Sequence, residues 1–197
     1  MVSDTREATA PIGLGLSGTW VQLEPESEVN AFEFRELEAL WLAAPAMGGL
    51  TYAGSSSFAS PMLVREQRSG VAVGIVANQR QPAGVATVLI FMDVNRSRGG
   101  SGAEAFALYV SHLFDSGARV VTAEVLSFNP ANRLLTRLGL TAQARLREHA
   151  YSAGHFWDVV VYSFTRSEFL ERLARYRRVL PGGTRRPVAL GSSRSRG

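Results

Sequence analysis

Residues suited to binding an anion gather in one turn near the middle of the chain. The segment NRSRGGSG, residues 95–102, follows an apolar stretch and precedes a helical pattern. Glycines allow the backbone to approach a ligand closely, and the N–H groups at a helix N-terminus attract anions. Arg96 and Arg98 add two positive charges suited to phosphate. The turn therefore predicts a site for a phosphorylated cofactor.

Two strands and two helices must position this turn. Residues 86–94 are rich in β-branched and aromatic side chains, which predicts a strand. Apolar residues then recur at helical spacing from Ala103 onward, and Gly117 would end that helix. A second strand is predicted over 119–127. An Asn-Pro turn and a short helix that closes at Gly139 follow it.

The flanking sequence predicts more strands than helices. Further strands are expected at 19–23, 62–66, 71–77, 141–152 and 156–165, and further helices at 32–43 and from a Ser167 cap to about Arg178. The three strands between 62 and 94 would form an antiparallel meander. One domain over residues 17–180 is expected, between a flexible N-terminus (1–16) and a disordered basic tail (181–197).

Composition excludes several classes of protein. A chain of 197 residues fits one domain with a sizeable core. With no cysteine, disulfides, thiolate catalysis and cysteine-ligated metals are excluded, and three histidines at unsuitable spacing predict no metal site. The sequence has neither an apolar run of membrane-spanning length nor the layout of a signal peptide. We therefore expect a cytoplasmic protein without a membrane partner.

The positive charge of the chain lies at its C-terminal end. All 21 basic residues are arginine, and from Arg166 onward nine arginines face two glutamates, a local charge of +7. Since the whole chain carries +4, residues 1–165 carry −3. A globular domain with this balance is not predicted to bind nucleic acid.

One alternative for the glycine turn is a dinucleotide fingerprint. The pattern Gly100-x-Gly102-x-x-Ala105 follows a strand and opens a helix, and Glu124 falls 22 residues after Gly102, where a ribose-binding acid would stand. However, a dinucleotide-binding domain normally begins with this unit. Only about 70 residues remain here, and their pattern predicts two strands and a helix rather than repeated strand–helix pairs.

A second alternative is a serine nucleophile. The pattern Gly99-x-Ser101-x-Ala103 approximates the strand-to-helix elbow of serine hydrolases. That chemistry needs a downstream acid and a histidine, for which His149 or His155 could serve only nominally. The chain is also short for that fold, and the sharp corner between strand and helix is missing.

The order of these elements resembles the GCN5-related N-acetyltransferase superfamily. The pyrophosphate loop of that family, Q/R-x-x-G-x-G/A, is matched at Gly100 and Gly102, while its basic position falls on Ser97, between two arginines. Residues 129–140 (NPANRLLTRLGL) resemble the segment N-x-x-A/S-x-x-L-Y/L-x-K-x-G-F but are one residue shorter. Residues 146–169 resemble the ending common among members that act on amino sugars and protein N-termini. The resemblance covers about residues 18–170.

The resemblance implies an α/β fold with a mixed, twisted, largely antiparallel sheet of about seven strands and flanking helices. Acetyl-CoA would lie in a V between two parallel strands that end at Val94 and Ser127, and an amine would attack its thioester directly. The residues implied to bind acetyl-CoA are Met92, Val94, Arg96, Arg98, Gly99, Gly100, Ser101, Gly102, Ala103, Asn129 and Asn132.

The resemblance also implies catalytic residues. Glu124 would be the base, because it stands five residues before Asn129, as in ribosomal-protein N-terminal acetyltransferases. Asp93 is the second candidate. The family's general-acid tyrosine is absent from the short helix, and Tyr162 and Tyr151 of the hairpin are the candidates to replace it.

The acceptor is expected to be a primary amine of a small molecule, such as an amino sugar, or of a protein N-terminus. Tyr52, Phe58 and Ser127 are the residues predicted to contact it. The charge of −3 and the acidic stretch 24–38 favour a cationic or neutral amine. Two alternatives stay open: a domain that binds acyl-CoA without turnover, and a transferase for another acyl group. A homodimer through the C-terminal strands or helix is also possible.

Overall fold

The computed structural model describes residues 16–43, 59–81, 84–97, 99–152 and 154–179. The elements in chain order are β1 (Leu16–Ser17), β2 (Val21–Pro25), α1 (Ala31–Ala43), β3 (Ala59–Glu66), β4 (Ala72–Gln81), β5 (Val85–Met92), α2 (Ser101–Asp115), β6 (Val120–Leu126), α3 (Ala131–Arg137), β7 (Ala142–Ser152), β8 (His155–Thr165) and α4 (Arg166–Val179). Within these ranges, no helix has the length and apolar character needed to cross a membrane.

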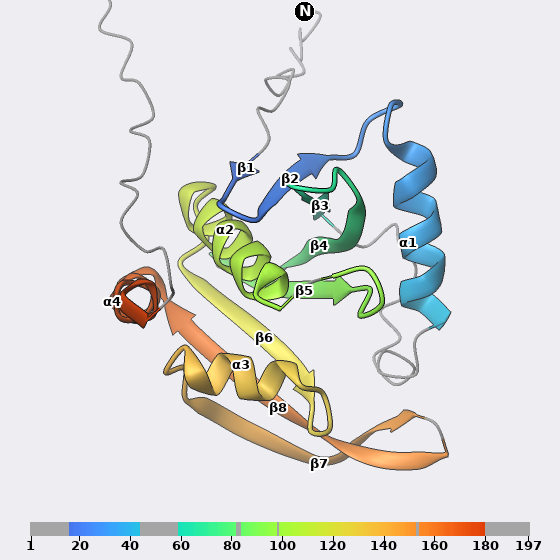
Figure 1. Cartoon of the computed structure of the whole chain (residues 1–197). Coiled ribbons are helices and arrows are strands. Elements are labelled where there is room, and N and C mark those ends of the chain that lie inside the picture. Colours follow the sequence, from blue (N-terminus) through green and yellow to red (C-terminus); the bar gives the residue numbers. More distant parts are fainter. Residues whose placement is uncertain (1–15, 44–58, 82–83, 98, 153, 180–197) are drawn as a thin grey trace, which may run out of the picture.

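The strands form one sheet in the order β1-β2-β3-β4-β5-β6-β8-β7. Every neighbouring pair is antiparallel except β5 and β6, which run parallel (Figure 1). The expected mixed, largely antiparallel α/β fold is therefore confirmed. The sheet has eight strands rather than about seven, because a two-residue strand, β1, pairs with β2.

Helices cover both faces of the sheet. The larger core lies between the sheet and α2, α3 and α4, which contribute Tyr109, Leu135 and Phe169 among others. A smaller core lies on the other face, where Phe34 and Leu37 of α1 pack against β3, β4 and β5 (Figure 1). Each helix thus buries its apolar side on the sheet. The two faces are called the α2 face and the α1 face below.

The last helix begins two residues earlier than expected. α4 starts at Arg166, and Thr165 rather than Ser167 stands at its N-cap. The Thr165 N–H and hydroxyl both donate to Oε2 of Glu168, at 2.8 Å each. Because Glu168 is the third helical residue, the pair forms a capping box. These hydrogen bonds lower the pKa of Glu168 below its ordinary value.

Candidate functional site

The two parallel strands separate before they end. The β5–β6 pairing runs from Val85 opposite Val120 to Val88 opposite Ala123 and goes no further. Both strands nevertheless continue, β5 to Met92 along β4 and β6 along β8. The sheet therefore opens into a V in its middle, between strand ends that are each held on their outer side.

Backbone groups of β5 point into this opening. The Asp93 N–H donates to the carbonyl of Val73 in β4 at 2.8 Å. In an antiparallel pair, successive residues direct their N–H and C=O groups alternately to either edge of the strand. The peptide groups of Ile90 and Met92 therefore point toward β6, at the place where β6 has moved away. Such groups can pair with amides of an extended ligand.

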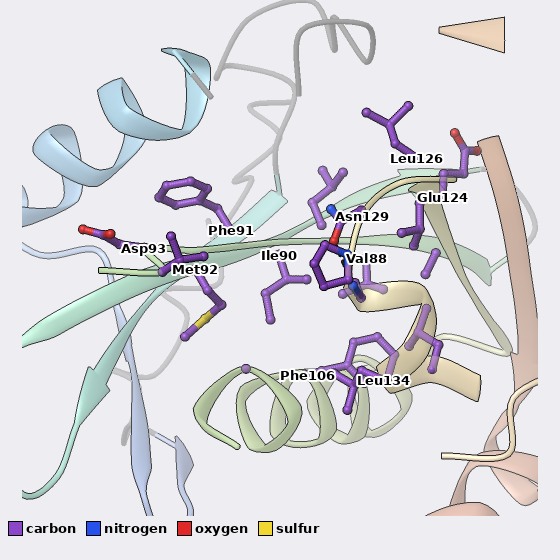
Figure 2. Close-up of a pocket in the computed structure, with 18 of the residues that line it drawn as sticks. Val88, Ile90, Phe91, Met92, Asp93, Phe106, Glu124, Leu126, Asn129 and Leu134 are labelled. Carbon is purple, nitrogen blue, oxygen red and sulfur yellow. Dashed lines mark hydrogen bonds between the residues drawn. The ribbon is translucent and has the colours of Figure 1, made fainter. Parts of the chain in front are cut away.

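A pocket of about 540 Å³ occupies the opening. Its walls come from the ends of β5 and β6, from Leu40 of α1, from Gly102 and Phe106 of α2, and from the turn and first residues of α3 (Figure 2). Of the residues expected at the site, it brings together Met92, Asp93, Val94, Gly102, Glu124 and Asn129.

The pocket runs through the sheet from one face to the other. The hydroxyls of Thr87 in β5 and Thr122 in β6 lie 2.8 Å apart, so these side chains share a face. Leu89, two residues after Thr87, packs with the α1 core, which identifies that face. Glu124 and Leu126, at steps of two from Thr122, therefore lie on the α1 face as well.

The other wall of the pocket belongs to the α2 face. Ile90 and Met92 of β5 pack against the α2 core, and Ala123 and Val125 of β6 are part of it. A ligand in the pocket can thus reach α2 on one side of the sheet and Glu124 on the other.

The first turn of α2 borders the α2-face entrance. Gly100 adopts a left-handed conformation (φ 101°), and a Cβ there would lie 2.8 Å from the Trp20 ring. The Glu104 N–H makes the first helical bond, to the Gly100 carbonyl. The N–H groups of residues 101–103 therefore have no acceptor within the helix, which suits them to an anion. A Cβ on Gly102 would lie 3.3 Å from Cγ of Met92.

The arginine expected to bind phosphate is held by carboxylates. Arg96 donates from Nη2 to Oε1 of Glu36 at 2.6 Å, and its Nε lies 3.1 Å from Oδ2 of Asp93. The hydrogen bond and charge of Glu36 raise the pKa of Arg96 above its ordinary value. Arg98 lies outside the described residues. Arg96 is thus paired with carboxylates, whereas the first turn of α2 presents N–H groups that the helix does not use.

Part of the acidic stretch 24–38 is paired with arginines. Glu33 binds Arg65 through two hydrogen bonds of 3.0 and 2.6 Å, and Glu24 binds the same guanidinium. The hydrogen bond with Arg65 lowers the pKa of Glu33. With Glu36 on Arg96 as well, these charges support a cationic acceptor less than the sequence suggested.

Two carboxylates line the pocket within the described residues, and they differ in their surroundings. Asp93 accepts the N–H of Asn95 at 2.9 Å on one oxygen and pairs with Arg96 on the other. Glu124 is half-buried on the α1 face. Both carboxylates therefore border the space that a ligand in the pocket would occupy.

Asn129 of the β6–α3 turn and Asn132 of α3 have different surroundings. Asn129 lines the pocket, and its Oδ1 accepts the Ala131 N–H at 2.9 Å. Asn132 lies outside the lining: its amide donates to the Leu126 carbonyl at 2.8 Å, and its Oδ1 accepts the hydroxyl of Tyr162 at 3.1 Å. Asn132 and Tyr162 thus stabilise the turn through hydrogen bonds outside the pocket.

The structure does not bring every expected residue to the pocket. Tyr162 is buried in the α2 core. Ser127, whose N–H donates to the Asp158 carbonyl, and Ser101, whose hydroxyl donates to Glu66, are not among the lining residues. Tyr52 and Phe58 lie outside the described residues.

Sequence reasoning missed the apolar side chains of the α1-face half. Leu40, Phe91 and Phe128 line the pocket there. Phe128 directly precedes Asn129, so its position beside the asparagine turn was a usable signal. Leu40 lies on the helix 31–43 but far in sequence from the strands, and no local pattern indicated its role.

Comparisons with known proteins bear on the fold. No protein-family model matches the sequence, and no curated protein matches it. A GCN5-related N-acetyltransferase from Brucella melitensis is similar in structure, with a TM-score of 0.67 and 24% identity over 86% of each chain.

Two further solved structures are similar. A ribosomal-protein-S5-alanine acetyltransferase from Vibrio fischeri has a TM-score of 0.64 and 11% identity, covering 80% of this chain and 99% of its own. RimJ of Mycobacterium smegmatis, in complex with CoA-disulfide, has a TM-score of 0.62 and 18% identity, covering 79% and 88%. The chain has the fold of the GCN5-related N-acetyltransferases, as the sequence resemblance predicted.

Proposed function

We propose that this protein is an acetyl-CoA-dependent N-acetyltransferase whose acceptor is a primary amine. One observation carries the proposal: the parallel strands part after Val88 and Ala123, and the pocket between them joins the two faces of the sheet. A thioester held from one face can then meet an amine that enters from the other. The similarity in fold to N-acetyltransferases supports the same chemistry.

The residues of the α2 face fit acetyl-CoA. The pantetheine arm is narrow and carries amides, which would pair with the peptide groups that β5 directs into the opening, near Met92 and Val94. The diphosphate would lie at the N–H groups of residues 99–103. The absence of a side chain at Gly102 leaves room for the arm beside Met92, and Asn129 would contact it from the turn. Arg98 is a further candidate for the phosphates.

On the α1 face, Glu124 would take the proton of the attacking amine. The nitrogen forms its bond to the acetyl carbon as the carbon–sulfur bond breaks, which needs the two groups held in contact. The proton that the amine loses can return to the departing thiolate through Glu124 and water. No tyrosine is therefore needed to protonate the thiolate. We assign Tyr162 a structural role, in which its hydroxyl donates to Asn132.

The acceptor amine would enter from the α1 face, as part of a small molecule or as the N-terminus of a peptide. One similar protein is named a ribosomal-protein-S5-alanine acetyltransferase, which supports a protein N-terminus.

The test combines coenzyme binding with turnover. Calorimetry with coenzyme A should give a saturable heat, and a thiol-release assay with acetyl-CoA and a panel of primary amines should exceed the rate of Glu124→Gln. Binding without release would instead assign an acyl-CoA-binding domain. Faster release from propionyl- or succinyl-CoA would assign another acyl group. Absence of any binding heat would overturn the proposal.

A further inference from the structure

The α1-face half of the pocket is apolar and partly aromatic. Leu40 of α1 and Phe128 of the β6–α3 turn are 41% and 40% exposed, and both line the pocket. Phe91 and Leu126 complete this side from the two strands. These large apolar side chains are in contact with water at the pocket mouth. An apolar group of a ligand that covers them lowers the free energy of the complex.

The aromatic part of this wall is held in place. The ring of Phe128 lies 4.4 Å from the ring of Trp157, centroid to centroid, at 58°. Trp157 in turn packs against the cluster of Leu126, Ala150 and Val159. A ring supported in this way offers a ligand a fixed surface with little conformational entropy to lose.

Polar partners are few. Within the described residues, the pocket lining as a whole contains four polar side chains: Asp93, Asn95, Glu124 and Asn129. Asp93 is bound by Arg96 and by the Asn95 N–H, and the oxygen of Asn129 accepts the Ala131 N–H. A sugar would lose water from several hydroxyls here without gaining enough partners, which is unfavourable.

We propose that the acceptor is a primary amine that carries an aromatic group close to its nitrogen. The ammonium would meet the carboxylate of Glu124, and the ring would pack between Phe91 and Phe128. This inference rests on the proposed acetyltransferase function. The same chemistry occurs in a free arylalkylamine and in a peptide that begins with phenylalanine, so the experiment includes both.

The experiment measures kcat/KM for acetyl transfer to 2-phenylethylamine, to a Phe-Ala-Ala peptide amide, to glucosamine and to spermidine. Wild-type protein should prefer one of the two aromatic amines over both polar amines by at least about tenfold. The preferred aromatic amine shows whether the acceptor is a free arylalkylamine or a peptide that begins with phenylalanine. Phe128→Ala should reduce kcat/KM for that amine about tenfold and leave the values for glucosamine and spermidine unchanged.

Phe156→Ala is the matched control. Phe156 lies next to Trp157 in β8, so its side chain is on the opposite face of that strand. It is 66% exposed and lies outside the pocket lining. This variant should keep the wild-type preference. Unchanged coenzyme A affinity would show that Phe128→Ala is folded, and Phe128→Leu, which keeps apolar bulk, should lose less of the preference.

The outcomes separate the two proposals. If coenzyme A binds and transfer occurs, but glucosamine or spermidine is the better acceptor, the aromatic-amine inference is overturned and the acetyltransferase proposal stands. The same holds if Phe128→Ala reduces transfer to all amines equally. If coenzyme A binds but no amine is acetylated, or if it does not bind, the proposed function itself fails and the inference with it.

Discussion

The hydroxyl oxygens of Thr87 and Thr122 lie 2.8 Å apart, one residue before the last paired position of β5 and β6. This hydrogen bond joins the two strands immediately below the point where they separate. Thr87 is almost fully buried, at 1% exposure. The pair therefore lies at the base of the V.

Single and double substitutions of this pair should give different stabilities. Thr122→Val removes a partner from the buried Thr87 hydroxyl, so the free energy of unfolding should fall by about 1–2 kcal/mol. Thr87→Val with Thr122→Val replaces both hydroxyls by methyl groups of similar shape and should cost less than the sum of the single changes. Urea unfolding of the four proteins in a double-mutant cycle measures this coupling. Strictly additive costs would mean that the hydroxyls do not act as a pair.

A side chain at position 102 should block the coenzyme. A Cβ on Gly102 already meets Met92 at 3.3 Å, so Gly102→Val would place two methyl groups in the entrance of the pocket. We expect the Kd for coenzyme A to rise at least about tenfold in calorimetry, with a thermal unfolding curve close to wild type. Ser116→Ala, at the opposite end of α2, should leave the Kd unchanged. Equal Kd values for Gly102→Val and wild type would place the coenzyme elsewhere.

The two pocket carboxylates should differ in their effect on turnover. Glu124→Gln keeps the shape of the side chain but cannot take a proton, so kcat/KM should fall about 100-fold or more while the Kd for coenzyme A stays the same. Asp93→Asn should reduce kcat/KM far less, because Asp93 accepts the Asn95 N–H and forms an ion pair with Arg96. Steady-state kinetics of both variants test this assignment. A larger loss in Asp93→Asn than in Glu124→Gln would reverse it.

The capping box of α4 should make stability depend on pH. The backbone and side-chain hydrogen bonds of Thr165 hold the pKa of Glu168 below its ordinary value of 4.5. A carboxyl whose pKa is depressed by folding stabilises the protein above its unfolded pKa, and this contribution is lost as the pH falls through the folded pKa. Glu168→Gln keeps an oxygen acceptor but has no charge. Its deficit in thermal stability relative to wild type should be present at pH 7 and shrink toward pH 3; a deficit of equal size at both pH values would contradict this.

The extent of sequence-based prediction can be seen in individual elements. The strand over 85–92 and the helix after the glycine turn were predictable, because β-branched residues and apolar spacing act over short distances. Their boundaries shifted: α2 begins at Ser101 rather than Ala103, as the left-handed Gly100 allows the helix to start there. Thr165 replaced Ser167 as the cap because Glu168 completes the box with a residue three positions before it.

The roles of several side chains depended on contacts that no local pattern contains. Arg96 was expected at a phosphate, yet it pairs with Glu36, which stands 60 residues earlier in the chain. Tyr162 was expected to supply a proton, yet its hydroxyl donates to Asn132 on another element. Phe128 lines the pocket together with Leu40, which stands 88 residues earlier in the chain.

By itself, the sequence determined the order of the elements, the glycine turn at the start of a helix and the carboxylate on the second parallel strand, because each depends on residue type and local spacing. Only the tertiary structure decided that β5 and β6 separate after four paired residues, and which side chains line the opening. The reason is that strand separation results from how β4 and β8 hold the outer edges of the two strands. Which side chains meet across the V depends on register between segments far apart in the chain.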